Sequence, residues 1–120
     1  THVLNFTTYG LIPAADNVVS LGTNSKKFSN VYCTNSTINT SDARLKIWTE
    51  CDRGMDFIKE VKTYKYKINN QDSLGLIAQD FINEFDSTEA ILERGEYYGL
   101  RYSEFIPIIV KAIQEYCNKN

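Results

Sequence analysis

The sequence of 120 residues predicts an α+β fold in which a small antiparallel sheet and several helices follow an all-β segment. Three observations carry this prediction. Composition changes around residues 40–46. Residues 63–68 alternate apolar and charged side chains, which is typical of a half-buried strand. Residues 104–117 place apolar side chains four and three residues apart, which indicates a helix. We therefore divide the chain into residues 1–40 and residues 41–120.

Residues 1–40 are poor in charge, rich in Thr, Asn and Ser, and lack helical periodicity. Strand candidates are residues 18–19, Leu21 and residues 28–38, separated by turn residues. This segment has too few apolar residues to fold alone.

Residues 41–120 read as one small domain. Its first predicted elements are a helix from Asp52 to about Val61, a strand over 63–68 and a turn over 69–72. A wholly apolar strand over 74–78 follows in the middle of the sheet, and then a short helix over 79–85 with Phe81 and Phe85 on one side. The chain ends with a hairpin joining 91–92 to 97–102 and a helix over 104–117 with Ser103 as N-cap.

The last helix carries an apolar stripe with the spacing of a coiled-coil seam over about two heptads. Its members are Ile106, Val110, Ile113 and Cys117. Within a single chain the stripe would be core, whereas around a threefold axis it would be a trimer seam. The spacing alone favours core.

Composition excludes several classes of function. The net charge is -2, from 13 basic and 15 acidic residues mixed along the chain, so nucleic-acid binding is disfavoured. Cys33, Cys51 and Cys117 are odd in number and widely spaced, which argues against a disulfide framework or a zinc site and favours buried or idle thiols. The sequence contains no run of 18 apolar residues, so no membrane span is expected. No metal or organic cofactor is indicated.

Ser41 is the candidate nucleophile. A serine hydroxyl needs a base, and the only histidine, His2, lies thirty-nine residues away, which argues against a Ser-His-Asp triad. Lys46 can serve as the base when its amine is neutral, with Arg44 as a possible local cation. Positions five apart on a helix point about 140° away from each other. The pair therefore needs a turn, or a Lys46 from a neighbouring chain; the alternative is that Ser41-Asp42 merely caps a helix or marks a boundary.

Three motifs in order resemble one family. They are Ser-Asp-x-Arg-Leu-Lys at residues 41–46, Gly-Leu-Ile-Ala-Gln at residues 75–79, and Tyr102 leading into the apolar last helix. Together, over residues 41–117, they are similar to the intramolecular chaperone domain of endosialidases and phage tail spikes, which is also classed as a self-cleaving serine peptidase.

The resemblance implies a homotrimer that cleaves itself at Ser41, with Lys46 as base and with Thr40, Asp42 and Arg44 at and around the cleavage site. Because these chaperones act as trimers, the resemblance favours a trimer seam over core for the apolar stripe of the last helix. The broken bond is either Thr40-Ser41, which the hydroxyl reaches through a five-membered ring, or Ser41-Asp42, which requires a neighbouring chain or a water-mediated route. Arg44, Leu45 and Lys46 all match the motif, which favours self-cleavage over a capping role.

The resemblance also bears on the upstream segment and the setting. Residues 20–22 and 27–32 are similar to the end of an intertwined three-chain β-shaft in phage fibres, although a plain hairpin packed on the following domain remains an alternative. The expected setting is a virion appendage or tail precursor made in the host cytoplasm, with the chaperone fragment released after cleavage. The side chains that three shaft copies would bury together are Val19, Leu21, Phe28, Val31 and Ile38.

Two other functions stay open. A trimerisation and folding module that does not cleave would leave Ser41 and Lys46 structural. A receptor-binding fibre tip would use tyrosines, of which Tyr97, Tyr98 and Tyr102 cluster in the predicted hairpin and could stack on sugar rings.

Overall fold

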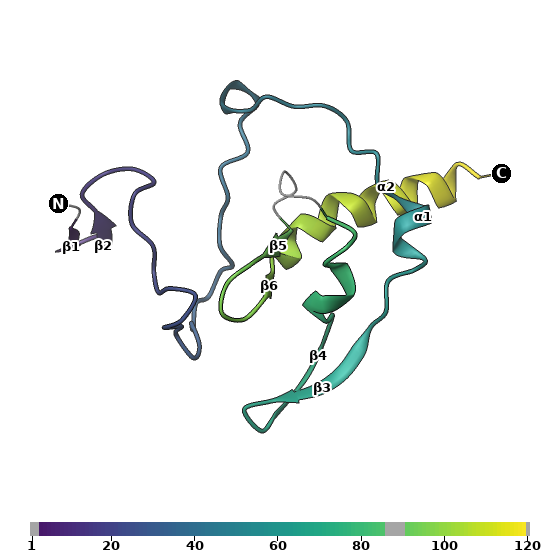
Figure 1. Cartoon of the computed structure of the whole chain (residues 1–120). Coiled ribbons are helices and arrows are strands. Elements are labelled where there is room, and N and C mark those ends of the chain that lie inside the picture. Colours follow the sequence, from purple (N-terminus) through teal and green to yellow (C-terminus); the bar gives the residue numbers. More distant parts are fainter. Residues whose placement is uncertain (1–2, 86–90, 120) are drawn as a thin grey trace. The chain divides into compact units, whose positions relative to one another are not determined.

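The computed structural model describes residues 3–85 and 91–119 and divides into two units, residues 1–37 and residues 38–120 (Figure 1). In the described part of the chain, no helix is long and apolar enough to cross a membrane.

The first unit contains one antiparallel hairpin, β1 (Leu4–Thr7) and β2 (Gly10–Pro13), with Thr7 opposite Gly10. The Thr7 hydroxyl accepts a hydrogen bond from the Tyr9 amide at 3.1 Å and donates to the Gly10 carbonyl at 3.2 Å, and Gly10 adopts a φ of 145°. The strand candidates at residues 18–19, 21 and 28–38 are wrong for the single chain, because none forms a strand there. None of residues 3–37 is buried, so this unit has no core of its own.

The second unit contains two α-helices, four short strands and three 3₁₀ turns among the described residues. They are η1 (Ala43–Leu45), α1 (Met55–Ile58), β3 (Tyr64–Ile68), β4 (Gln71–Gly75), η2 (Ala78–Phe81), β5 (Leu92–Glu93), β6 (Gly99–Leu100), η3 (Tyr102–Glu104) and α2 (Phe105–Cys117). The predicted strand at 63–68, the hairpin between 91 and 102 and the last helix are confirmed. The α+β class is confirmed as well.

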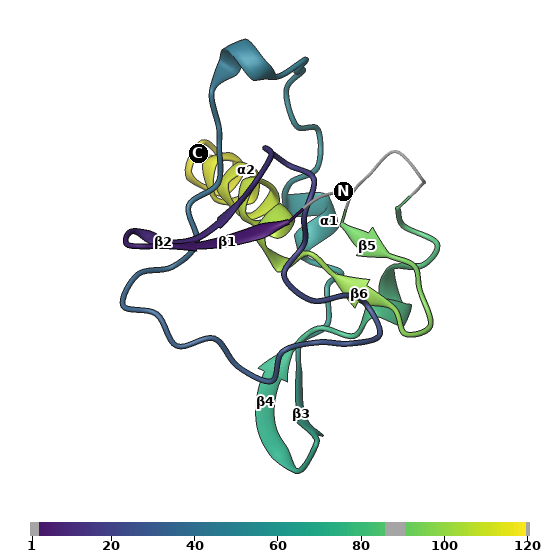
Figure 2. The ribbon, with the colours of Figure 1, turned by 90° about the vertical axis from the view of Figure 1, so that its left-hand side faces the viewer.

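The predicted single sheet is wrong, because the described strands form three separate two-stranded sheets. Asn69 and Asn70 have positive φ values of 50° and 63°, which suits a two-residue hairpin turn and pairs Ile68 with Gln71. That register starts β4 at Gln71 rather than at the predicted residue 74. Leu74 is then 77% exposed on a hairpin that extends away from both helices (Figure 2).

Two predicted helices are also shorter than expected. The helix from Asp52 shrinks to α1, with Gly54 rather than Asp52 at its N-cap. The helix over 79–85 is a single 3₁₀ turn, η2, although Phe81 and Phe85 are both buried as expected. The last helix has Glu104 rather than Ser103 at its N-cap.

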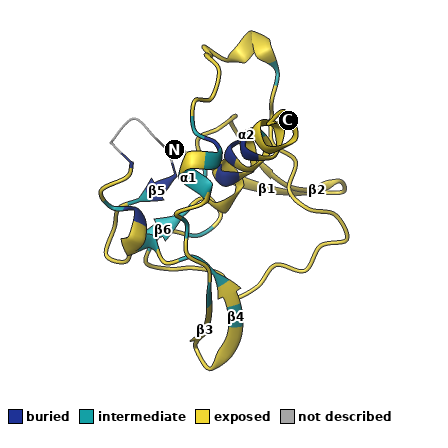
Figure 3. Cartoon of the chain, turned by 90° about the vertical axis from the view of Figure 1, so that its right-hand side faces the viewer, coloured by how far each residue is buried: buried dark blue, intermediate teal, exposed yellow. Residues whose placement is uncertain are grey.

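The core of the second unit is small and aromatic. Ring centroids of Phe57, Phe81, Phe85 and Phe105 lie 5.4–6.5 Å apart, at separations where tilted and edge-to-face aromatic pairs are favourable. Figure 3 shows the buried residues in α2 and around β5. The buried apolar residues are Phe81, Phe85, Ile91, Leu92, Phe105, Ile108 and Ala112.

The coiled-coil stripe of α2 is not part of this core, so the alternative in which the stripe forms the core of a single chain is wrong. α2 buries Phe105, Ile108 and Ala112, whereas the stripe lies on other faces of the helix. Ile106, Val110 and Ile113 are 60%, 48% and 57% exposed. Cys117 on the stripe is exposed as a free thiol, as are Cys33 and Cys51. Of the two predicted alternatives, buried or idle thiols, the buried one is therefore wrong for the single chain, and the idle one stays a prediction.

Candidate active site at the Ser41–Lys46 turn

The structure brings the two predicted catalytic side chains together within one chain. The ammonium Nζ of Lys46 donates a hydrogen bond to Ser41 Oγ at 2.7 Å. Of the two routes that the sequence left open, a turn or a neighbouring chain, the turn alone achieves this distance. A continuous helix through residues 41–46 would have separated them.

The turn that joins them is η1, and Asp42 caps it. The Asp42 carboxylate accepts a hydrogen bond from the Arg44 amide at 2.9 Å, and the backbone carbonyl of Asp42 accepts one from the Leu45 amide at 3.1 Å. The Lys46 amide donates to the Ala43 carbonyl at 3.2 Å, after which Lys46 returns to an extended conformation. This reversal turns the Lys46 side chain back toward Ser41.

Arg44 reinforces the same cap with its side chain. Its guanidinium makes a two-pronged contact with Asp42, Nη2 to Oδ2 at 2.7 Å and Nε to Oδ1 at 3.0 Å. The Arg44 side chain and then its amide lower the pKa of the Asp42 carboxyl, and the carboxylate in turn raises the pKa of Arg44. Arg44 thus serves the turn by pairing with Asp42, rather than acting as an isolated cation beside Lys46.

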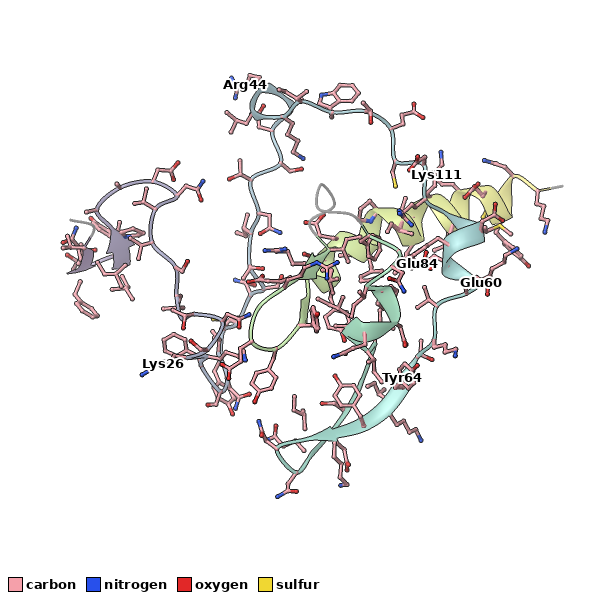
Figure 4. The ribbon with its side chains drawn as sticks, viewed as in Figure 1. Lys26, Arg44, Glu60, Tyr64, Glu84 and Lys111 are labelled. Atoms are coloured by element: carbon pink, nitrogen blue, oxygen red, sulfur yellow. The ribbon has the colours of Figure 1, made fainter. Side chains whose placement is uncertain are left out.

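The whole turn is open to solvent. Thr40, Ser41 and Lys46 are exposed, and Asp42 is half-buried. Figure 4 shows Arg44 at the outer bend of the extended segment that leads back toward α1 and α2. The single chain thus brings the candidate nucleophile and the candidate base into contact, and both side chains remain exposed.

The second and third sequence motifs meet at Tyr102. The Tyr102 hydroxyl accepts a hydrogen bond from the Leu76 amide at 3.0 Å and donates to the Leu76 carbonyl at 3.3 Å. A Cβ on Gly75 would lie 2.7 Å from this hydroxyl and 2.9 Å from that of Tyr66, so only glycine leaves enough room. Burial, followed by the charge and hydrogen bond of Tyr102, raises the pKa of Tyr66.

The contact of Tyr102 with Leu76 bears on the interpretation of the three tyrosines as a sugar-binding cluster. Tyr97, Tyr98 and Tyr102 are 69%, 41% and 50% exposed, so their rings remain accessible. The Tyr102 hydroxyl, however, is engaged with the backbone of Leu76, and its ring packs on Phe105 with centroids 6.5 Å apart. Tyr102 therefore joins the residue 75–79 motif to the start of α2.

Sequence reasoning missed the contacts that hold α1 in place. Glu115 of α2 accepts a hydrogen bond from the Met55 amide at 2.9 Å, and its side chain occupies the space a Cβ of Gly54 would need. Arg53 stacks over Phe57 and Phe85, at 5.2 and 4.8 Å, and donates to the Glu84 carbonyl at 2.8 Å.

A cavity of about 250 Å³ opens beside α1 and η2. Its walls carry the acidic residues Asp56, Glu60, Asp80 and Glu84 around an aromatic floor. Glu60 and Glu84 are labelled in Figure 4. In the part of the chain that the structure describes, no group of His, Cys, Asp and Glu is arranged to hold a metal ion.

Comparison with known proteins identifies the region that contains the turn. The family model Peptidase_S74, chaperone of endosialidase, matches residues 41–88. These residues are a Peptidase S74 chaperone of endosialidase domain. The match begins at Ser41, the first residue of the turn, and ends before β5. No curated protein and no solved structure matches the chain.

The S74 domain implies a role in chaperoning and in self-cleavage of the serine peptidase type. The resemblance of residues 41–88 is therefore confirmed. For residues 89–117 it stays a prediction, supported by the contact of Tyr102 with Leu76.

Proposed function

We propose that residues 41–120 are an intramolecular chaperone that trimerises, templates the folding of an upstream β-shaft in the same polypeptide and then cuts itself free at Ser41. The observation that carries the proposal is the 2.7 Å contact of Lys46 Nζ with Ser41 Oγ at the first residue of the S74 domain. Ser41 is the nucleophile and Lys46 the general base. Asp42 and Arg44 are positioning residues, because they hold the turn.

The chemistry begins when neutral Lys46 takes the hydroxyl proton of Ser41, whose oxygen attacks the Thr40 carbonyl carbon. The tetrahedral intermediate collapses as the Lys46 ammonium returns the proton to the departing Ser41 nitrogen. This step breaks the Thr40-Ser41 amide and forms an ester between the Thr40 carbonyl and Ser41 Oγ. Water, deprotonated by the same amine, then hydrolyses the ester to give a Thr40 carboxylate, and the Ser41 hydroxyl is regenerated beside a new amino terminus.

The alternative bond is Ser41-Asp42. Ser41 cannot attack its own carbonyl without a strained four-membered ring, so this cut needs a hydroxyl from a neighbouring chain or an activated water. The two routes leave fragments that differ by one serine. Both routes use only side chains of this polypeptide, from the same copy or a neighbouring one, and water.

Trimer formation is supported by two surfaces that the single chain leaves uncovered. The first is the α2 stripe, whose Ile106 and Ile113 are more than half exposed. The second is the unit of residues 1–37, whose described part buries no residue. Three copies would cover both, since strands of a shared shaft supply each other's missing partners.

Cleavage gives the process a direction. Non-local β-structure forms slowly, so a template that holds three strands in register speeds it. Once Ser41 has been cut, the shaft no longer carries its template and stays kinetically trapped. The corresponding setting is a phage tail fibre or appendage precursor made in the host cytoplasm.

The test is the intact mass, under denaturing conditions, of the freshly expressed chain and its variants. We expect the wild type to separate into two fragments at Ser41, while Ser41→Ala and Lys46→Ala remain whole. Lys65→Ala, which removes an exposed lysine from β3, should cleave like the wild type. The fragment masses assign the bond.

Cleavage of Ser41→Ala or Lys46→Ala at the wild-type rate would overturn the proposed dyad. If every variant stays whole, sedimentation decides the remaining question. A whole chain that forms trimers would be a trimerisation and folding module without peptidase activity.

A further inference from the structure

The segment after Ser41 displays large apolar side chains to water. Leu45, Ile47 and Trp48 are 76%, 107% and 68% exposed. We call residues 45–48 the apolar arm. Three such side chains within four residues are unusual for a chain that remains alone, because contiguous exposed apolar surface commonly marks an interface.

A groove on the outer face of α2 is the matching surface in the same unit. Its volume is about 570 Å³, and its apolar floor is formed by Ile106, Pro107 and Val110. Glu50 and Lys111 place opposite charges along its walls. Figure 4 shows Lys111 on α2, near the end of the extended segment. Trp48 is not among the residues that line the groove, so the chain's own arm leaves the groove open.

We propose that the apolar arm of one copy docks in the α2 groove of a second copy of this chain. The inference rests on the proposed function and adds the contact that completes its active site. An indole buries about 150–250 Å², and a groove of this volume accommodates it together with a neighbouring aliphatic side chain.

Charge complementarity favours a second copy as the occupant. Glu50 follows the arm two residues after Trp48, and the groove of the other copy presents Lys111. An arm laid across the apolar floor can therefore set the Glu50 that follows it against Lys111 of the other copy. The arm and the groove are thus complementary in both polarity and charge.

The symmetry of the proposed trimer fits this contact. Arm-into-groove is a heterologous contact, because two different surfaces meet, and such contacts close only as rings or continue as filaments. In a closed ring of three, every arm and every groove is used once. The arm contact alone is smaller than the roughly 800 Å² per partner of a stable interface, so it adds to the contact along the α2 stripe.

Docking carries the dyad into the interface, because Lys46 lies between Leu45 and Ile47. Exclusion of water around a lysine favours its neutral form, the form that can act as a base. The dyad geometry is already present in the single chain, and the second copy supplies the missing environment. Cleavage would then depend on assembly through the arm.

Trp48 is the single tryptophan of the chain, so its fluorescence reports on the arm directly. The test uses the full chain as Ser41→Ala, which we expect to stay whole, over a range of concentrations with sedimentation in parallel. We expect the emission to shift to shorter wavelength and acrylamide quenching to fall in step with trimer formation. A trimer whose Trp48 remains as quenchable as in urea would overturn the inference.

A crosslinking pair locates the docked arm. In the full chain carrying Ser41→Ala, with Cys33, Cys51 and Cys117 replaced by serine, we introduce Thr49→Cys, which keeps the Trp48 indole, together with Val110→Cys. We expect disulfide-linked dimers and trimers on a non-reducing gel. The matched control pairs Lys65→Cys with Val110→Cys and should give none. Crosslinks within single chains only, or equal crosslinking in the control, would overturn the inference.

The outcomes separate this inference from the proposed function. Wild-type cleavage with an accessible Trp48 in the trimer would overturn arm docking and leave self-cleavage intact. A buried, crosslinked arm in a wild-type chain that never cleaves would support docking and overturn the peptidase role. A chain that remains monomeric at every concentration would overturn both.

Discussion

Replacing Gly75 with alanine should destabilise the second unit by about 1–2 kcal/mol. The new Cβ would lie 2.7 Å from the Tyr102 hydroxyl and 2.9 Å from the Tyr66 hydroxyl, so at least one ring must move. Moving Tyr102 gives up its hydrogen bonds with Leu76, at 3.0 and 3.3 Å, each worth about 1 kcal/mol net. A gain of about 0.4–1 kcal/mol from the stiffer unfolded chain offsets part of this loss.

The assay is urea unfolding followed by circular dichroism, at one fixed protein concentration, in the Ser41→Ala chain. For a domain of 60–100 residues, 1 kcal/mol corresponds to about 4–8 °C in Tm, so thermal unfolding gives an independent check. The matched control is Gly99→Ala, because a Cβ there would meet its nearest neighbour, Glu93 Cβ, at an ordinary 3.7 Å. We expect that control to lie within about 0.5 kcal/mol of the parent.

A double-mutant cycle tests the stated cause. In a background of Tyr66→Phe and Tyr102→Phe, both close hydroxyls are gone, and the cost of Gly75→Ala should fall well below its cost in the parent. The reasoning fails if Gly75→Ala is tolerated as well as Gly99→Ala. It also fails if the cost is unchanged when the hydroxyls are removed.

Three further predictions follow from other contacts. Asp42→Asn should slow cleavage and leave the circular dichroism spectrum unchanged. Because the pKa of the Asp42 carboxyl is lowered, its hydrogen bond to the Arg44 amide should persist above pH 3.8 and be lost as the pH falls through the lowered value. NMR titration of the Arg44 amide would show this loss. Hydrogen bonding to Asp80 raises the pKa of Tyr64 above 10.0, so the contribution of this hydrogen bond to stability should be complete below pH 10 and lost as the pH rises through the raised value. Tyr64→Phe should remove this alkaline loss of stability in pH-dependent thermal unfolding. Ile113→Asp should cost the trimer about 1.5–3 kcal/mol per chain, seen by sedimentation as dissociation at higher concentration, whereas an unchanged trimer would rule out the α2 stripe as its seam.

Local patterns predicted the elements whose cause is local. The alternation over residues 63–68 gave β3, and the spacing after residue 104 gave α2. The hairpin register was harder, because it depends on positive φ at both Asn69 and Asn70. Once those two residues form the whole turn, β4 must begin at Gln71, and the apolar Leu74 is carried to an exposed position.

Contacts between distant residues could not be read in the same way. The sequence motifs placed Gly75 and Tyr102 in one family pattern, but not the hydrogen bonds of Tyr102 with Leu76 that join them. Likewise, nothing near Gly54 in the sequence shows that Glu115, sixty residues from Met55, will cap α1. Whether Ile113 is buried within the single chain also required the structure, because a buried and an exposed stripe have the same spacing.

The Ser41–Lys46 pair shows where a gate on self-cleavage can act. Because the two side chains already meet at 2.7 Å in a single chain, assembly has no distance left to close. Both groups are exposed, so what the single chain lacks is exclusion of water, and a dry surface must come from another copy or from the shaft. On the proposed function, cleavage is therefore timed by burial of a preformed pair. A variant whose chains assemble while the Ser41–Lys46 turn stays accessible to water should keep the two side chains in contact. On this reasoning it should still remain uncut.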